Sequence, residues 1–279
     1  MNAQLATDAG RVTVLMYHRV GHAMNDWESK YCVSPRRFAS HMKALQQRGM
    51  RPCSIDDFVA WLDGAGALPD KTFLLTFDDG FLGVYEHAFP LLAAMGWRAT
   101  MFLVSGLIGR EDQWCRHENP SGKAYPLLGR REIEEMAGRG FSFQSHSRSH
   151  PDLTKLDRGA LTAELAGARR DLEDLLGQPV RYLAYPYGRY HETVLEVTRA
   201  SGYHAAFSVQ PGFNRRDVDR FQIRRLDVFG TDTATALLRK VTYGTNDGSW
   251  WQPVRYYGER VRARLRSAPA LSDDTTTRR

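Results

Sequence analysis

Four polar side chains in two short stretches have the types and spacing of a metal site. Asp78 and Asp79 follow an apolar run in TFLLTFDDG, and His146 and His150 stand four residues apart in HSRSH. That separation brings both imidazoles to one side of a helical turn or a tight loop. Two neutral imidazoles and one carboxylate form a facial ligand set for Zn²⁺ or another divalent ion, such as Co²⁺ or Ni²⁺.

Such a site needs only one of the two aspartates, which leaves the other free. The free carboxylate can act as a general base toward water whose pKa the ion lowers. Two adjacent carboxylates would normally raise the pKa of one of them, but a dication keeps both ionised. Each motif also has an ordinary structural interpretation, because DDG is a frequent turn sequence and an isolated HxxxH pair often lies on the surface.

Short apolar segments alternate with helical ones and predict the elements that position these side chains. Uninterrupted apolar runs are typical of strands buried on both faces, as in a parallel sheet. We expect strands at residues 12–17, 72–77, 99–104, 141–143, 181–185, 205–209 and 221–226.

Helix signals lie between the predicted strands. Ser34 and Pro35 can begin a helix that ends near Gly49, and another is expected after Ser54. Further helices fit residues 85–95, 131–137, 159–176 and 193–200. This alternation predicts an α/β fold of parallel strands with right-handed crossovers, either closed as a barrel or left open.

The carboxyl ends of the strands are where such folds gather their chemistry. We therefore expect one rim to collect His18, Asp78 with Asp79, His146 with His150, and Tyr187, each of which follows a predicted strand. The long connection 105–129 is rich in Gly, Pro and polar residues and lacks helical periodicity. Connections of this length are often functional, and Trp114, His117 and Tyr125 could line a cleft there.

The ordered set of motifs resembles a known family. TFDDG, RATMFLVSGLIG, FSFQSHSRSHPDLTKL and LAYPYG occur in this order within residues 12–237. This combination is similar to polysaccharide deacetylases of the NodB-homology type, carbohydrate esterase family 4, and is more specific than any single motif. The resemblance implies a distorted (β/α)₇ barrel and metal-dependent hydrolysis of N-acetyl groups on amino sugars.

The resemblance also implies a role for each matching residue. Asp78 matches the catalytic base, whereas Asp79, His146 and His150 match the metal ligands. The backbone N–H of Tyr187 matches the group that helps to hold the developing oxyanion.

Two expected catalytic residues are missing from their usual places. Ala184 stands where the family has an arginine before the turn, and Val228 stands where it has a histidine. LMYHRV resembles the branch that includes poly-N-acetylglucosamine deacetylases, which implies that His18 is the acid. Asp227 could orient His18, and Arg224 or Arg225 could replace the arginine.

Composition limits the remaining classes of function. With 279 residues and 42% hydrophobic content, we expect one catalytic domain over residues 1–245 and a basic, aromatic, partly disordered tail over residues 246–279. The tail could pack on the barrel or lie on an anionic membrane surface. The formal charge of +6 is spread along the chain, which disfavours nucleic-acid binding. Cys32, Cys53 and Cys115 have no metal-binding spacing, and we interpret them as packing residues, with a Cys32–Cys53 bridge as the alternative if the protein is exported.

The first ten residues, MNAQLATDAG, lack the basic and apolar regions of a secretory signal. No window of about 18 uninterrupted apolar residues exists to span a bilayer. We therefore expect a cytoplasmic location, with peripheral membrane contact through the tail as an open alternative. The expected substrate is an N-acetylated oligo- or polysaccharide, or a lipid- or nucleotide-linked amino sugar. A deacylase of another amide, such as a formamide, and a carbohydrate-binding pseudoenzyme are the alternatives.

Overall fold

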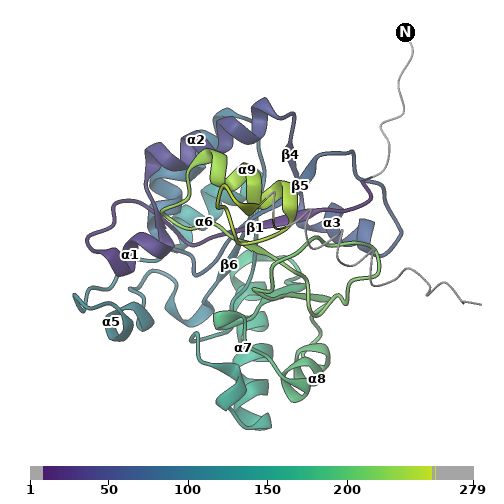
Figure 1. The fold of residues 1–279 in the computed structure, drawn as a ribbon. Coiled ribbons are helices and arrows are strands. Elements are labelled where there is room, and N and C mark those ends of the chain that lie inside the picture. Colours follow the sequence, from purple (N-terminus) through teal and green to yellow (C-terminus); the bar gives the residue numbers. More distant parts are fainter. Residues whose placement is uncertain (1–8, 253–254, 256–279) are drawn as a thin grey trace, which may run out of the picture.

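Parallel strands surrounded by helices make up the part of the chain that the computed structural model describes, residues 9–252 and Arg255 (Figure 1). The strands are β1 (Thr13–Tyr17), β2 (Arg19–Val20), β3 (Cys32–Val33), β4 (Arg51–Cys53), β5 (Thr72–Phe77), β6 (Ala99–Leu103), β7 (Phe141–Ser145), β8 (Tyr182–Ala184), β9 (Ala205–Phe207) and β10 (Leu226–Asp227). The α-helices are α1 (Asp26–Tyr31), α2 (Pro35–Gln47), α3 (Ile55–Leu62), α4 (Phe89–Ala94), α5 (Trp114–Glu118), α6 (Arg130–Ala137), α7 (Arg158–Leu176), α8 (Glu192–Ala200) and α9 (Ala234–Tyr243). A π-helical turn, η1 (Val84–Ala88), precedes α4, and short 3₁₀ turns lie at η2 (Ser105–Leu107), η3 (Leu153–Lys155) and η4 (Pro186–Gly188).

The main sheet is parallel throughout and confirms the strand predictions for its centre. Its order is β10-β1-β5-β6-β7-β8-β9, and β4 pairs with the beginning of β5. The register aligns Tyr17 with Phe77 at the ends of β1 and β5. The ends of these two strands therefore lie side by side, as the prediction of a shared rim requires.

The segment 221–228 closes the sheet into a distorted barrel. We expected one strand over residues 221–226, but the segment divides between two edges. Ile223 forms a parallel bridge with Phe207 of β9, whereas Leu226 and Asp227 form β10 beside β1. The same stretch of chain thus contacts both ends of the sheet.

Alternation along the strands separates the two sides of the barrel, although both sides are apolar. Leu15 and Leu75 belong to the large core beneath the helices, whereas Val14 and Leu74 belong to a second core inside the barrel. Trp61 of α3 is fully buried in that second core. Because both faces are buried, the strands have the uninterrupted apolar runs of a covered parallel sheet.

The helices that cover the barrel begin and end as their sequence signals indicate. The Ser34 hydroxyl accepts a hydrogen bond from the backbone N–H of Arg37, with Pro35 as the first residue of α2. Gly177 ends α7 in the left-handed conformation, where it lacks the Cβ that would be strained. In Figure 1, α2 lies beside α9, and α7 lies beside α8.

Several short elements were not predicted. The connection 105–129, in which the sequence shows no helical periodicity, contains α5, and the Asp112 carboxylate accepts the backbone N–H of Cys115 at 2.9 Å at its start. A helix of five residues is too short to show a hydrophobic period. The helices α1 and α9 and the small β2–β3 sheet were also missed.

The cysteine prediction is confirmed, since all three thiols are free and buried. Among the helices of residues 9–252, none has both the length and the apolar content needed to cross a membrane. Trp250 and Trp251 are exposed and stack on one another with ring centroids 3.7 Å apart. Most of the predicted tail, residues 253–254 and 256–279, lies outside the described residues, so the domain boundary at 245 stays a prediction.

Candidate active site

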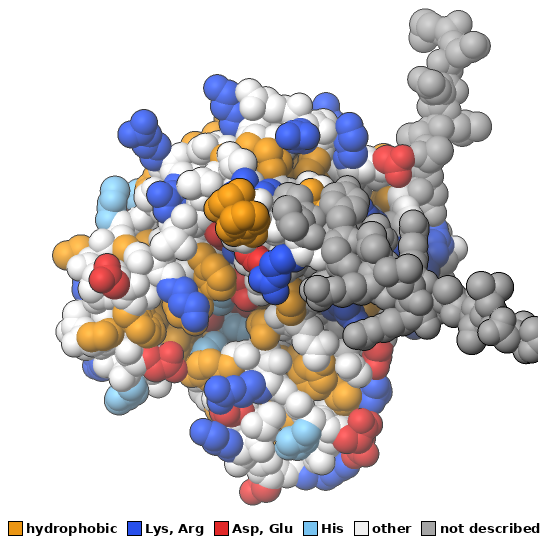
Figure 2. All heavy atoms as spheres, in the orientation of Figure 1, with side chains coloured by type: hydrophobic (Ala, Val, Ile, Leu, Met, Phe, Trp, Pro, Cys, Tyr) orange, Lys and Arg blue, Asp and Glu red, His pale blue; other side chains and the backbone are white. Residues whose placement is uncertain are grey.

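A cleft of about 330 Å³ opens at the carboxyl ends of the strands. Figure 2 looks into this hollow, which has histidine side chains at its bottom and hydrophobic and basic side chains around its mouth. All six predicted site residues line the cleft: His18, Asp78, Asp79, His146, His150 and Tyr187. The predicted convergence of four strand ends is therefore what the structure shows.

The two-residue repeat of a strand explains why these side chains face inward. Val14 and Leu74 point into the barrel from β1 and β5. Side chains an even number of residues apart along a strand point to the same face. His18 is four residues after Val14, and Asp78 is four residues after Leu74, so both point toward the inside of the barrel. The interior of the barrel thus changes from apolar at its base to polar at its rim.

Three donor atoms meet at the bottom of the cleft. Oδ1 of Asp79 lies 3.4 Å from Nε2 of His146 and 3.4 Å from Nε2 of His150. All three side chains are buried, and Oδ1 of Asp79 has no hydrogen-bond partner. A tetrahedral ion with bonds of about 2.0–2.1 Å keeps its ligand atoms about 3.3–3.4 Å apart. The donor types, the spacing and the unpaired buried oxygen therefore fit a divalent metal ion.

Local hydrogen bonds and charges prepare these ligands. Nδ1 of His146 lies 2.8 Å from the carbonyl oxygen of Ala184, a contact in which Nδ1–H donates and the lone pair of Nε2 stays free for the metal. Burial would raise the pKa of Asp79, but the adjacent imidazoles of His146 and His150 outweigh it and lower that pKa to about 2. Burial lowers the pKa of His150 to about 3, which favours the neutral ring that a metal requires.

Aromatic rings fix the orientation of His150. The Trp114 indole, from α5, stacks on its imidazole with centroids 4.1 Å apart and the planes at 28°. The ring of Tyr187 meets it edge to face at 4.8 Å. The hydroxyl of Tyr187 in turn donates to Glu118 of α5. The connection 105–129 thus covers one side of the metal site.

Backbone strain gathers at this site. Among the described non-glycine residues, positive φ angles occur at Asp79 (74°), Ser147 (67°), His150 (62°) and Tyr187 (57°), and elsewhere at Lys71 (63°). Each such residue costs on the order of 1–3 kcal/mol and persists where its surroundings hold it. Four of the five lie at or between the predicted site residues, which supports a functional origin for the strain.

Asp78 is held by a buried arginine. Nη1 and Nη2 of Arg225 donate to the two carboxylate oxygens of Asp78 at 2.7 and 2.8 Å, and Nε donates to the carbonyl of Ser208. Burial would raise the pKa of Asp78, but the guanidinium outweighs it and the net shift is downward. Of the two arginines that the sequence offered, Arg225 makes this contact, whereas the side chain of Arg224 is exposed.

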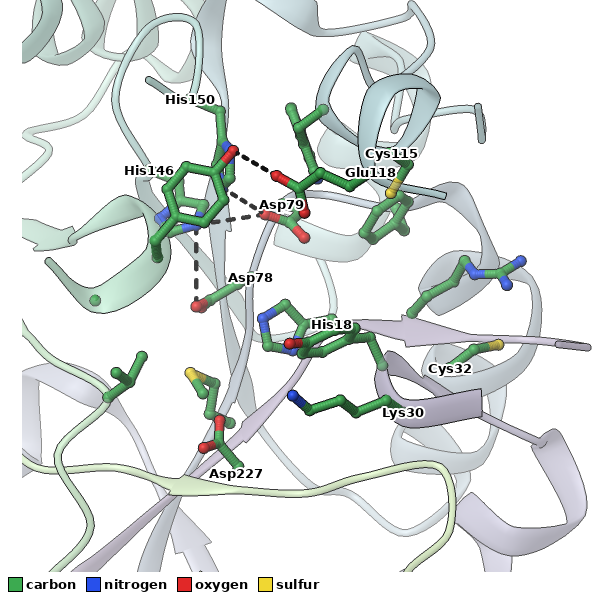
Figure 3. Close-up of a pocket in the computed structure, with 18 of the residues that line it drawn as sticks. His18, Lys30, Cys32, Asp78, Asp79, Cys115, Glu118, His146, His150 and Asp227 are labelled. Carbon is green, nitrogen blue, oxygen red and sulfur yellow. Dashed lines mark hydrogen bonds and ion pairs between the residues drawn. The ribbon is translucent and has the colours of Figure 1, made fainter. Parts of the chain in front are cut away.

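His18 and Asp227 lie on another side of the same cavity (Figure 3). The His18 ring lies 5.5 Å from the Tyr31 ring, edge to face. The Asp227 carboxylate accepts a hydrogen bond from Asn246, and burial raises the pKa of Asp227. The cleft therefore contains both residues, but the side chain of Asp227 is hydrogen-bonded to Asn246 rather than to His18. Its orienting role toward His18 stays a prediction.

Other residues of the cleft were missed by the sequence analysis. Trp114 and Tyr125 line it as expected, but His117 is not among the lining residues. Part of the remaining wall comes from the chain after β1 and from the loop after β10, and includes Arg19, Trp27, Glu28, Lys30, Tyr31 and Phe229. Trp27 and Tyr31 are four residues apart, which places them on one face of a helix, and this spacing was the sequence signal for α1.

Known proteins share this fold and this sequence pattern. The profile of the polysaccharide deacetylase family matches residues 65–206. Poly-beta-1,6-N-acetyl-D-glucosamine N-deacetylase of Staphylococcus epidermidis is 25% identical over 245 residues, covering 81% of each chain.

Solved structures agree with these sequence matches. IcaB from Ammonifex degensii has a TM-score of 0.67 at 29% identity, covering 80% of this chain and 94% of that one. The Streptococcus pyogenes deacetylase PplD, in complex with acetate, has a TM-score of 0.71 at 24% identity, covering 83% and 98%, and supports the fold alone. The predicted distorted (β/α)₇ barrel is confirmed. The chain belongs to the polysaccharide deacetylase family and is a hydrolase that acts on carbon–nitrogen bonds.

Proposed function

We propose that the protein removes N-acetyl groups from an amino-sugar glycan in a metal-dependent reaction. The observation that carries this proposal is the facing set of Asp79, His146 and His150 beside the arginine-held Asp78. The name of the Staphylococcus epidermidis relative makes poly-N-acetylglucosamine the first substrate to test. Zn²⁺ is the first candidate ion, with Co²⁺ and Ni²⁺ as alternatives, because the donor set suits each of them.

In this proposal Asp79, His146 and His150 hold the ion, which when bound polarises the acetamide carbonyl and lowers the pKa of water. Asp78 takes the proton from the attacking water. Its Oδ2 lies 4.0 Å from Nε2 of His146, so the base borders the ion site. Arg225 occupies both oxygens from one side, which keeps the carboxylate ionised and aimed.

The remaining proton transfer goes to the departing amine. We assign it to His18, which lines the cleft from the end of β1, whereas the two ligand histidines follow β7. The backbone N–H of Tyr187 would donate to the carbonyl oxygen as negative charge develops there. Tyr187 adopts its left-handed conformation next to His150, so its peptide group borders the same cavity.

Acetate release from N-acetylated substrates tests the proposal. The panel contains poly-N-acetylglucosamine oligomers, nucleotide- and lipid-linked N-acetyl sugars, and an N-formyl sugar that tests the formamide alternative. We expect acetate from the glycan oligomers, loss of activity after chelation, and recovery on adding Zn²⁺, Co²⁺ or Ni²⁺. Formate without acetate, or full activity in the chelated protein, would contradict the proposal.

Loss of the base and loss of a metal ligand should have different effects. Asp78→Asn leaves the three metal ligands in place and should lower kcat by at least about a hundredfold while retaining metal. His146→Ala removes a ligand and should lose the metal itself. Metal content is measured by plasma mass spectrometry beside the acetate assay. An Asp78→Asn protein with wild-type turnover would show that the base is another residue.

A further inference from the structure

Two connections of the barrel form the walls of the cleft. One follows β1 and contains β2 and α1, and the other is the connection 105–129 with α5. In Figure 1, α1 and α5 lie on the same side of the molecule. They start from different strands, so side-chain contacts between them join the two walls of the cleft.

Glu28 of α1 joins the two walls. Its side chain is 2% exposed, although it is a carboxylate. From its own connection, Oε2 accepts Nη2 of Arg19 at 2.7 Å and the backbone N–H of Met24 at 2.8 Å. From the opposite wall, Oε1 accepts Nδ2 of Asn119 at 2.8 Å and the hydroxyl of Tyr125. Each oxygen of one carboxylate therefore serves one pair of donors.

Neighbouring contacts extend this link. Nδ2 of Asn25 donates to Oδ1 of Asn119 at 2.9 Å, again from one wall to the other. The guanidinium of Arg19 lies over the Tyr125 ring, 3.5 Å from its centroid. Arg19, which directly follows His18 in the chain, therefore links the two walls a second time.

The joined walls carry the side chains around the mouth of the cleft. Trp27, Lys30 and Tyr31 come from α1, whereas Trp114 and Glu118 come from α5. Trp27 and Trp114 both pack against one small core beneath α5. Flat aromatic rings beside charged groups suit the apolar faces and hydroxyls of a sugar chain.

We propose that Glu28 is a positioning residue for glycan recognition, which holds α1 and α5 at the separation that a bound sugar chain requires. This inference rests on the proposed deacetylase function and adds the wall-to-wall link as its specificity element. Glu28 acts through Trp27, Tyr31 and Trp114 rather than on the reacting atoms. Its loss should therefore weaken recognition of a sugar chain more than hydrolysis of a small acetyl group.

Two variants of the link provide the test. Glu28→Gln keeps the shape of the side chain but turns an NH₂ group toward one of the two donor pairs, so at least one N–H donor of that pair loses its acceptor. Tyr125→Phe removes a single donor and keeps the ring beneath Arg19, so it tests the link even if Glu28→Gln does not fold. Glu173→Gln is the matched control, because Glu173 accepts from Arg169 and from the N–H of Val180 outside the cleft.

The measurement is the ratio of kcat/KM for an N-acetylglucosamine pentamer to kcat/KM for 4-nitrophenyl acetate, which has no sugar. Loss of a hydrogen bond to a charged group should lower this ratio by about tenfold in Glu28→Gln, and less in Tyr125→Phe. Glu173→Gln should lower the melting temperature without changing the ratio. If both variants of the link keep the wild-type ratio, Glu28 has only a structural role and the inference is wrong.

Binding gives a second readout that does not need turnover. In an Asp78→Asn background, calorimetric titration with the pentamer should show the same loss of affinity on adding Glu28→Gln. An unchanged affinity would also overturn the inference. Acetate release by the wild-type protein is scored separately, so failure of the deacetylase proposal is distinguished from failure of the positioning role.

Discussion

Arg225 and Asp78 form an ion pair at 2.7 Å, and both are almost fully buried. The guanidinium lowers the pKa of Asp78 although burial opposes it. The stabilisation from this pair is therefore present above the pKa of an unfolded aspartate, about 3.9, and is lost as the pH falls through the lower value of the folded protein. A base that stays ionised in acid suits hydrolysis over a wide pH range.

Replacing Arg225 should expose both roles of the pair. Arg225→Met leaves a buried carboxylate without its partner, which should lower the free energy of unfolding by about 3–5 kcal/mol. The pKa of Asp78 should rise, so the acid limb of the kcat/KM profile moves to higher pH. Urea denaturation and a pH series measure the two effects.

Arg224 supplies a control of the same type. Its side chain is exposed, so Arg224→Met should change neither quantity. If the acid limb of the kcat/KM profile stays at the same pH in Arg225→Met, the base whose ionisation limits the rate is a residue other than Asp78.

Elements differ in how well the sequence predicts them. Long apolar runs such as 72–77 predicted β5 with its bounds, because burial on both faces leaves a clear pattern. The helices α1 and α5 escaped prediction because six and five residues are too few for a period. The sequence left Arg224 and Arg225 equivalent, since the direction of each side chain depends on how segment 221–228 crosses between two edges.

The helix α5 should matter to the metal through Trp114. Its indole stacks on His150 at 4.1 Å, so Trp114→Ala frees the imidazole to rotate. We expect the metal affinity to fall by about tenfold, measured by competition with a chelator. Trp114→Phe keeps a stacking ring and should retain most of the affinity. Equal metal affinity in the alanine variant would show that the strained backbone at His150 is enough.

At the scale of the whole molecule, Lys240 of α9 binds the segment that closes the barrel. Lys240 is 1% exposed, and its Nζ donates to the carbonyl of Asp227 at 2.9 Å and to the carboxylate of Asp232. These contacts hold the loop after β10, which carries part of the cleft wall. A buried lysine with such partners links the core to the site.

Lys240→Met should therefore destabilise the fold. A buried ion pair broken on one side costs about 3–5 kcal/mol, which urea denaturation measures as a lower midpoint. Lys43→Met, at an exposed position of α2, should leave the midpoint within experimental error. If the two variants unfold alike, the Lys240–Asp232 pair does not hold the barrel closed.

The cytoplasmic location expected from the sequence is a separate prediction, which cell fractionation tests.

The seam at residues 221–228 also has a consequence for synthesis. During translation β1, which His18 directly follows, leaves the ribosome first, whereas Arg225, which neutralises Asp78, emerges nearly at the end of the barrel. Until then a nascent chain lacks the guanidinium that pairs with that carboxylate, and burying the carboxylate without it would be costly. Ring closure and charge neutralisation are therefore one late event, and a chain stopped before Arg225 should yield no competent hydrolase.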